Sequence, residues 1–140
     1  MITIKKQEFV KLEDILHLYQ AVGWTNYTNQ PQMLEQALSH SLVIYLALDD
    51  DAVVGLIRLI GDGFSSVFVQ DLIVLPSYQR QGIGSALMKQ ALADYKDAYQ
   101  VQLATEETEK TLGFYRSLGF ETLSSFQCTG MILVGRKKFK

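Results

Sequence analysis

The sequence predicts a single α/β domain (α+β in some classifications) that spans residues 1–140. Helical spacing of apolar residues dominates the first third, strand patterns fill residues 42–74, and helix and strand patterns alternate after Pro76. The strand–helix–strand order of the second half is a βαβ unit, which requires one parallel pair of strands. The expected sheet is therefore mixed but mostly antiparallel, with six to seven strands and about four flanking helices.

The first third of the chain predicts one weak strand and two helices. Ile2 and Ile4 alternate with polar residues, as in a half-buried strand. A helix is expected over residues 12–22, where apolar residues recur at helical spacing before Gly23. Residues 24–29 predict an irregular connection, and Pro31 suits the first turn of a short second helix.

The middle of the chain predicts three consecutive antiparallel strands over residues 42–48, 52–60 and 66–74. Three aspartates form a tight turn after the first of these strands, and two glycines flank an aspartate after the second. Hairpins joined in this way form a meander. The third strand ends before Pro76, which cannot donate a hydrogen bond to a ladder.

The chain after Pro76 predicts a helix over residues 82–96, a strand over 101–104 and a helix over 108–118. The strand lies parallel to residues 66–74, as the βαβ connection requires. Beyond Gly119, the short apolar runs 120–123 and 131–134 predict a closing hairpin.

Composition excludes several classes of function. Hydrophobic residues make up 48% and charged residues 20%, which is ordinary for a globular domain. A net charge of −2 argues against general nucleic-acid binding, which needs a basic face. Cys128 is the only cysteine, and neither a leader nor an apolar run of membrane length is visible. We therefore expect a cytoplasmic protein with no nucleic-acid partner, no membrane partner and, from its isolated histidines, no metal.

The junction between the strand 66–74 and the following helix is the most distinctive part of the chain. Its residues are Gln79-Arg80-Gln81-Gly82-Ile83-Gly84. A helix N-terminus offers unpaired N–H groups and a partial positive charge, and glycines let a ligand approach them, so the loop suits a phosphate or pyrophosphate. A Walker A loop would need lysine where Ser85 stands, and a dinucleotide fingerprint would need glycine or alanine where Leu87 stands. A glycine-tolerant turn without a ligand is the other alternative.

These residues resemble the GCN5-related N-acetyltransferase (GNAT) family. Its first signature, Arg/Gln-x-x-Gly-x-Gly/Ala at the head of the helix after the fourth strand, is matched by residues 79–84. Its second signature, a helix that carries Phe-Tyr and ends in Gly-Phe, is matched by residues 114–120. The predicted element order agrees with the family fold over nearly the whole chain. The resemblance implies an acyltransferase that uses acetyl-CoA as its donor.

The resemblance also implies where acetyl-CoA would bind. In this family the fourth strand is bulged and separates from the fifth, and the pantetheine arm lies in the gap. The residues implied to hold the pyrophosphate by backbone N–H groups or side chains are Gln79, Arg80, Gln81, Gly82, Gly84 and Ser85. The residues implied to contact the pantetheine arm or the thioester are Leu72, Ile73, Val74, Thr105 and Phe114. Thr105 follows the fifth strand, where many members carry asparagine, so this contact departs from the family pattern.

Two residues are candidates for proton transfer. Tyr115 matches the family's general acid, because a phenol with a pKa of about 10 can protonate a departing CoA thiolate. Packing alone is the alternative for Tyr115, which shares a helical face with apolar neighbours. Asp71 is the candidate general base for the acceptor amine, and Glu106 and Glu107 are alternatives.

The resemblance also implies where the acceptor substrate would bind. In this family the first two helices and their connection usually form a wall of the acceptor site. Trp24 and Tyr27 would supply an aromatic wall, although Trp24 could instead cap the core. The expected partner is a primary amine of a small molecule or peptide, acetylated by direct attack in a ternary complex. The sequence leaves open whether the protein forms a homodimer. The alternative functions are a non-catalytic CoA-binding sensor or interaction module on the same fold, and a phosphate or nucleotide binder of another fold.

Overall fold

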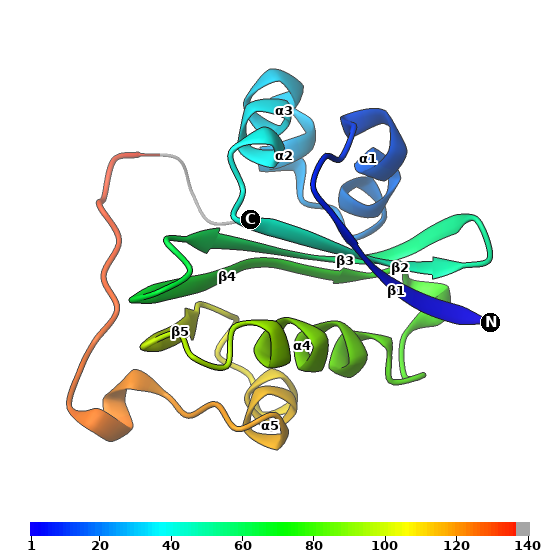
Figure 1. Ribbon diagram of the computed structural model, residues 1–140. Coiled ribbons are helices and arrows are strands. Elements are labelled where there is room, and N and C mark those ends of the chain that lie inside the picture. Colours follow the sequence, from blue (N-terminus) through cyan, green and yellow to red (C-terminus); the bar gives the residue numbers. More distant parts are fainter. Residues whose placement is uncertain (137–140) are drawn as a thin grey trace.

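A five-stranded mixed sheet crosses the centre of the molecule (Figure 1). The computed structural model describes residues 1–136. The strands are β1 (Ile2–Gln7), β2 (Val43–Asp49), β3 (Ala52–Gly61), β4 (Ser66–Val74) and β5 (Gln100–Leu103). They follow this order across the sheet, and every neighbouring pair is antiparallel except β4 and β5, which are parallel. The predicted α/β class and mixed sheet are confirmed, with five strands instead of six to seven.

Helices cover both faces of this sheet. Figure 1 shows α1 (Leu12–Ala21), α2 (Thr25–Thr28) and α3 (Pro31–Ser39) on one face, and α4 (Ile83–Asp94) and α5 (Glu109–Ser117) on the other. The four-residue helix α2 occupies part of the connection that the sequence predicts to be irregular. The described residues therefore contain five α-helices, where about four are expected, and none of these helices could cross a bilayer.

Two hydrophobic clusters hold the helices to the sheet. In β2, Val43, Tyr45 and Ala47 join the cluster that packs beneath α4. The intervening Ile44 and Leu46 join the cluster beneath α1, α2 and α3. Because successive side chains of a strand point to opposite faces, a strand covered on both faces is apolar throughout. This explains the continuous apolar run that predicts a buried strand here.

Gly55 sets the close approach of β3 to its neighbours. A Cβ atom at this position would lie 3.0 Å from the carbonyl oxygen of Ile73 and 3.4 Å from Cδ1 of Leu87. Any larger side chain would push against both β4 and α4. The glycine therefore lets α4, which follows the loop 79–84, pack directly on the sheet.

The closing hairpin predicted for residues 120–123 and 131–134 is wrong. Residues Leu123–Phe126 form the 3₁₀ helix η2, and no described residue after it belongs to a strand. The Thr122 hydroxyl lies 3.0 Å from that of Ser124, which supports the turn locally. The apolar run at 131–134 has strand composition but pairs with no strand within residues 1–136, and a strand needs a hydrogen-bonding neighbour.

Candidate active site

A bulge at Gln70 interrupts β4. Arg58 of β3 is opposite Asp71, whereas the next residue, Leu59, is opposite Val69, so Gln70 has no counterpart on β3. The extra residue reverses the side-chain alternation. Val69 therefore lies in the cluster beneath α4 and Ile73 in the cluster beneath α1, although their even spacing would place them on one face. The bulged fourth strand implied by the family resemblance is confirmed.

The strands β4 and β5 separate just beyond this bulge. Their pairing ends with Val69 opposite Leu103, while β4 continues to Val74. A cavity of about 360 Å³ opens between β4, the loop after β5 and α5. Leu72 and Thr105 both line it, as predicted for contacts with the pantetheine arm. The side chain of Ile73 is buried in the core on the other face, so the role predicted for this residue rests on its backbone N–H group.

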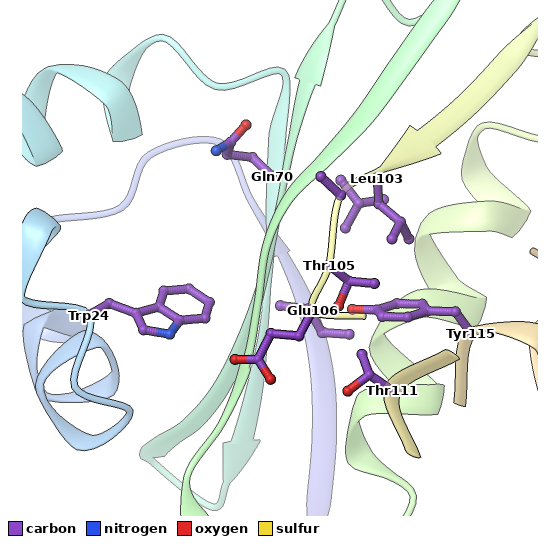
Figure 2. A pocket seen from close by; sticks show the side chains of 10 residues that line it. Trp24, Gln70, Leu103, Thr105, Glu106, Thr111 and Tyr115 are labelled. Atoms are coloured by element: carbon purple, nitrogen blue, oxygen red, sulfur yellow. The ribbon is translucent and has the colours of Figure 1, made fainter. Parts of the chain in front are cut away.

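Tyr115 projects from α5 into this cavity, with its hydroxyl beside Thr105 (Figure 2). Its ring packs edge-on against Phe120, with ring centroids 5.9 Å apart. Burial raises the pKa of the Tyr115 hydroxyl, and a hydrogen bond with Thr105 opposes that rise. The phenol is therefore protonated at neutral pH, the state that a general acid requires. The residue both packs and faces the cavity, so its two predicted roles are compatible.

Glu106 and Trp24 lie on the other side of the same cavity. Figure 2 shows the Glu106 carboxylate between the indole of Trp24 and the ring of Tyr115. Glu107, the adjacent carboxylate, lines a neighbouring groove instead. The cavity thus places an aromatic wall and a carboxylate opposite a phenol.

Asp71, the other candidate base, is buried away from this arrangement. Its side chain is 0% exposed, and its Oδ2 accepts hydrogen bonds from Nε of Arg58 and the hydroxyl of Tyr19, both at 2.8 Å. It does not line the cavity. A carboxylate held in this way is a structural anion. The geometry therefore argues against the base role that the sequence suggested for Asp71.

Tyr27 belongs to the same buried network, not to an exposed aromatic wall. Only 8% of the residue is exposed, and its hydroxyl donates to Oδ1 of Asp71 at 3.3 Å. Burial, followed by the charge of Asp71, raises the pKa of Tyr27. Of the two residues predicted to form an aromatic wall of the acceptor site, Trp24 lines the cavity and Tyr27 does not. Trp24 also packs on Tyr19, with centroids 6.0 Å apart, so it joins the core to the cavity.

The predicted anion loop precedes α4 in the expected way. Gly82 is the N-terminal cap of α4 in the left-handed region at φ +80°, and no side chain caps the helix. The first α-helical bond runs from the N–H of Ala86 to the carbonyl of Gly82, so the N–H groups of Ile83, Gly84 and Ser85 precede the helical ladder. These groups and the helix dipole favour an anion at this end.

The loop before α4 also carries Gln79 and Arg80, whose side chains are predicted to lie at the edge of the pyrophosphate. The amide of Gln79 donates to the carbonyl oxygen of Val74 at 3.1 Å, so it holds the loop to β4. Arg80 is exposed and has a left-handed φ of +65°. A Cβ atom at Gly84 would lie in ordinary van der Waals contact with Phe114, at 3.5 Å, and Val74, at 3.8 Å. Phe114 thus brings α5 against the first turn of α4.

Arg58 is the main residue at the site that sequence reasoning missed. It is 4% exposed and connects β3 to the bulge through Asp71, at 2.8 Å. A lone arginine inside the apolar run 52–60 was the available signal, because a buried charge requires a partner. Among the described residues, no group of three His, Cys, Asp or Glu side chains could hold a metal ion.

Comparison with known proteins decides the family. A model of the acetyltransferase (GNAT) domain matches residues 40–122, which include the bulged strand, the anion loop and Tyr115. The chain belongs to the GNAT family of acetyltransferases. A solved GNAT family structure from Streptococcus pneumoniae TIGR4 is 80% identical, with a TM-score of 0.90 over 98% of this chain and 100% of that one.

Two plant members of the GNAT family also align with this chain. Serotonin N-acetyltransferase 2, chloroplastic, of Oryza sativa subsp. japonica is 36% identical over 97 residues, which cover 65% of this chain and 48% of the rice protein. GCN5-related N-acetyltransferase 1, chloroplastic, of Arabidopsis thaliana is 27% identical over 135 residues, or 95% of this chain and 67% of that protein. The match therefore spans about half the length of the rice relative.

Replacing Arg58 by methionine should lower the free energy of unfolding by about 3–5 kcal/mol, because Asp71 would be left as a buried charge without its cation. Urea denaturation followed by tryptophan fluorescence measures the loss. Adding Asp71→Asn to this variant should recover part of it. Arg116→Met is the matched control: its partner Glu121 is 43% exposed, so the loss should be about 0–1 kcal/mol. Equal losses for Arg58→Met and Arg116→Met would contradict this account.

Proposed function

We propose that this protein transfers the acetyl group of acetyl-CoA to a primary amine of a small molecule or peptide, by direct attack in a ternary complex. The observation that carries the proposal is the cavity at the separation of β4 and β5. It brings Tyr115, Glu106 and Trp24 together. Phe114, the residue before Tyr115, lies against Gly84 in the first turn of α4. Membership of the GNAT family supports acetyl-CoA as the donor.

In this mechanism the amine nitrogen attacks the thioester carbonyl carbon, and the carbon–sulfur bond then breaks. The departing thiolate takes a proton from the Tyr115 hydroxyl, which is protonated because burial raises its pKa. Beyond Val69, β4 is not paired with β5, so backbone N–H groups near Leu72 can face the thioester oxygen. Such a donor contributes about 3 kcal/mol to stabilisation of a developing oxyanion.

The base that receives the amine proton is assigned here to Glu106 instead of Asp71. Glu106 faces the cavity opposite Tyr115, whereas Asp71 accepts hydrogen bonds from Arg58 and two tyrosines inside the core. A base has to reach the proton directly or through one water molecule, and in this arrangement Glu106 is the carboxylate that lines the cavity.

The acceptor is proposed to carry an aromatic or alkyl group beside its amine. Trp24 offers an indole face to the cavity, and such a face attracts cations and apolar groups. The rice relative is called a serotonin N-acetyltransferase, so arylalkylamines belong in the first panel of acceptors. Aliphatic polyamines, amino acids and peptides with a free amine complete that panel.

Release of CoA from acetyl-CoA in the presence of each amine tests the proposal. Turnover with at least one amine is the expected result. Stabilisation by acetyl-CoA without turnover across the panel would favour the non-catalytic CoA-binding module. Thermal stabilisation by ATP or NAD but not by CoA would overturn the proposal, since a ligand stabilises a protein in proportion to RT ln(1 + [L]/Kd).

The variant Gly84→Glu should weaken acetyl-CoA binding at least about tenfold, a loss of about 1.4 kcal/mol. A Cβ atom fits at this position with ordinary contacts, and the new carboxylate adds negative charge to the first turn of α4, where it repels a pyrophosphate. Negative charge at a helix N-terminus stabilises the free protein, so the unliganded melting temperature should not fall. Calorimetric titration measures the affinity. Ala86→Glu, exposed on the same helix one position past the first turn, should bind acetyl-CoA nearly normally.

The variant Tyr115→Phe should lower kcat about 10²–10⁴-fold, the usual contribution of a positioned acid, and leave acetyl-CoA affinity within a few-fold of wild type. The acid acts only when protonated, and burial raises its pKa. Deprotonation of the Tyr115 hydroxyl should therefore not lower the wild-type kcat below about pH 10, and should lower it only above that pH. A pH profile of kcat measures both effects. Tyr99→Phe, at an 82% exposed tyrosine, is the control. An active Tyr115→Phe enzyme would restrict this residue to packing.

The variant Glu106→Gln should lower kcat about 10²-fold or more at neutral pH, because the amide cannot accept the amine proton. Acetyl-CoA binding should persist, since Glu106 is not among the residues implied to hold the cofactor. Steady-state assays at saturating acetyl-CoA measure the change. Glu107→Gln is the matched control, because Glu107 lines the neighbouring groove. If Glu107→Gln or Asp71→Asn at unchanged stability abolished turnover and Glu106→Gln did not, the assignment of the base would be wrong.

A further inference from the structure

The turn between β2 and β3 lies against the connection from β4 to α4. Figure 1 shows both segments at the same end of the sheet. The antiparallel pairing of β3 with β4 brings them there, since Gly55 near the start of β3 is opposite Val74, the last residue of β4. The backbone N–H of Leu75 also donates to the carbonyl oxygen of Val54 at 2.9 Å. A residue at this turn can therefore contact the segment that leads into the anion loop.

Asp49 and Tyr78 join these two segments. Asp49 is the last residue of β2 and the first of the three turn aspartates, and Tyr78 ends the 3₁₀ helix η1 (Pro76–Tyr78), directly before the loop 79–84. The Tyr78 hydroxyl donates to Oδ2 of Asp49 at 2.7 Å, and the half-buried tyrosine packs against the hydrophobic cluster beneath α4. This hydrogen bond lowers the pKa of the Asp49 carboxyl and raises the pKa of the Tyr78 hydroxyl. Both directions are those of a phenol that donates to an ionised carboxylate.

The backbone of the loop beyond Tyr78 needs support from its surroundings. Arg80 has a φ of +65° and Gly82 a φ of +80°. The left-handed region is unfavourable for a residue with a Cβ atom, so arginine persists there only where the adjoining structure holds the chain. On one side this support comes from α4, which begins directly after Gly82. On the other side it comes from the hydroxyl of Tyr78 and from the amide of Gln79, which donates to the carbonyl oxygen of Val74 at 3.1 Å.

We propose that Asp49 and Tyr78 are positioning residues for the donor, and that their hydrogen bond holds the loop 79–84 in the conformation that binds the pyrophosphate of acetyl-CoA. This inference rests on the proposed function. An anion at a helix N-terminus is bound by several N–H groups that converge on it, so their relative positions matter. A loop that already has its bound conformation loses less conformational entropy when the ligand binds. The first turn aspartate thus acts on donor binding as well as ending a strand.

Titration calorimetry with acetyl-CoA tests this role. The variant Tyr78→Phe keeps the packed ring and loses the hydroxyl, so its Kd should rise about 3- to 10-fold, the equivalent of one ordinary hydrogen bond. Its kcat at saturating acetyl-CoA should stay near the wild-type value, because Tyr78 does not line the cavity. Asp49→Asn keeps an oxygen that can accept from the phenol, so its affinity should stay close to wild type. Asp49→Leu should lose as much affinity as Tyr78→Phe, and combining the two should add no further loss.

Tyr45→Phe is the matched control. The Tyr45 hydroxyl donates to Oδ2 of Asp94 at 2.6 Å, at the other end of α4, so this variant loses the same kind of hydrogen bond far from the loop. Its affinity for acetyl-CoA should equal that of the wild type. Equal weakening by Tyr45→Phe and Tyr78→Phe, or wild-type affinity in Tyr78→Phe, would overturn the positioning role alone. A wild type that binds no acetyl-CoA would overturn the proposed function and this inference together.

Limited trypsin digestion measures the loop itself, without ligand or turnover. Trypsin cleaves after arginine, and Arg80 is exposed in the middle of the loop. Proteases cut most readily where an exposed segment is locally mobile. The ligand-free Tyr78→Phe variant should therefore be cleaved after Arg80 several-fold faster than the wild type, and Tyr45→Phe should be cleaved at the wild-type rate. Mass spectrometry identifies the fragment that ends at Arg80. An unchanged cleavage rate in Tyr78→Phe would show that the hydrogen bond does not hold the loop, and the proposal would be wrong.

Discussion

The buried ion pair between Arg58 and Asp71 is the interaction on which the rest of the structure depends. Its side chains are 5% and 0% exposed, and the two residues are opposite each other at the bulge in β4. Hydrogen bonds from Tyr19 and Tyr27 to the same carboxylate bring α1 and α2 into the pair. A charge in this environment is tolerable only with its full set of partners, so the helices, β3 and the bulge are fixed together.

The bulge that this pair fixes explains why the domain has a cavity at all. An unbroken β4 would continue beside β5, and the backbone groups beyond Val69 would be used in a ladder. With the extra residue Gln70, the pairing with β5 stops at Leu103 and the two strands part. Tyr19, whose pKa is raised by burial and then by the charge of Asp71, remains a protonated donor to that carboxylate. The polar core thus maintains an opening in an otherwise continuous sheet.

Local patterns were sufficient to predict most of the fold. The alternation in β1, the turn aspartates and the glycines before α4 each act over a few residues, and the structure forms the corresponding elements. Side-chain direction near a bulge cannot be predicted in this way. One inserted residue decides whether Asp71 faces the cavity or the core, and whether Tyr27 is an aromatic wall or a buried donor. The prediction of a strand over residues 131–134 was wrong for another reason. The composition of this segment is typical of a strand, but strand pairing depends on a neighbour that sequence spacing does not specify.

The donor half of the proposed site consists of main-chain groups and the acceptor half of side chains, and this difference has an evolutionary consequence. At the head of α4, the groups that face an anion are main-chain N–H groups, which nearly every amino acid supplies. On the side of Trp24 and Glu106, recognition depends on individual side chains. If the proposed function holds, substitutions there would change which amine is accepted and leave the donor half intact. Proteins that share this fold can therefore diverge in their acceptor while the backbone groups of the donor half stay the same.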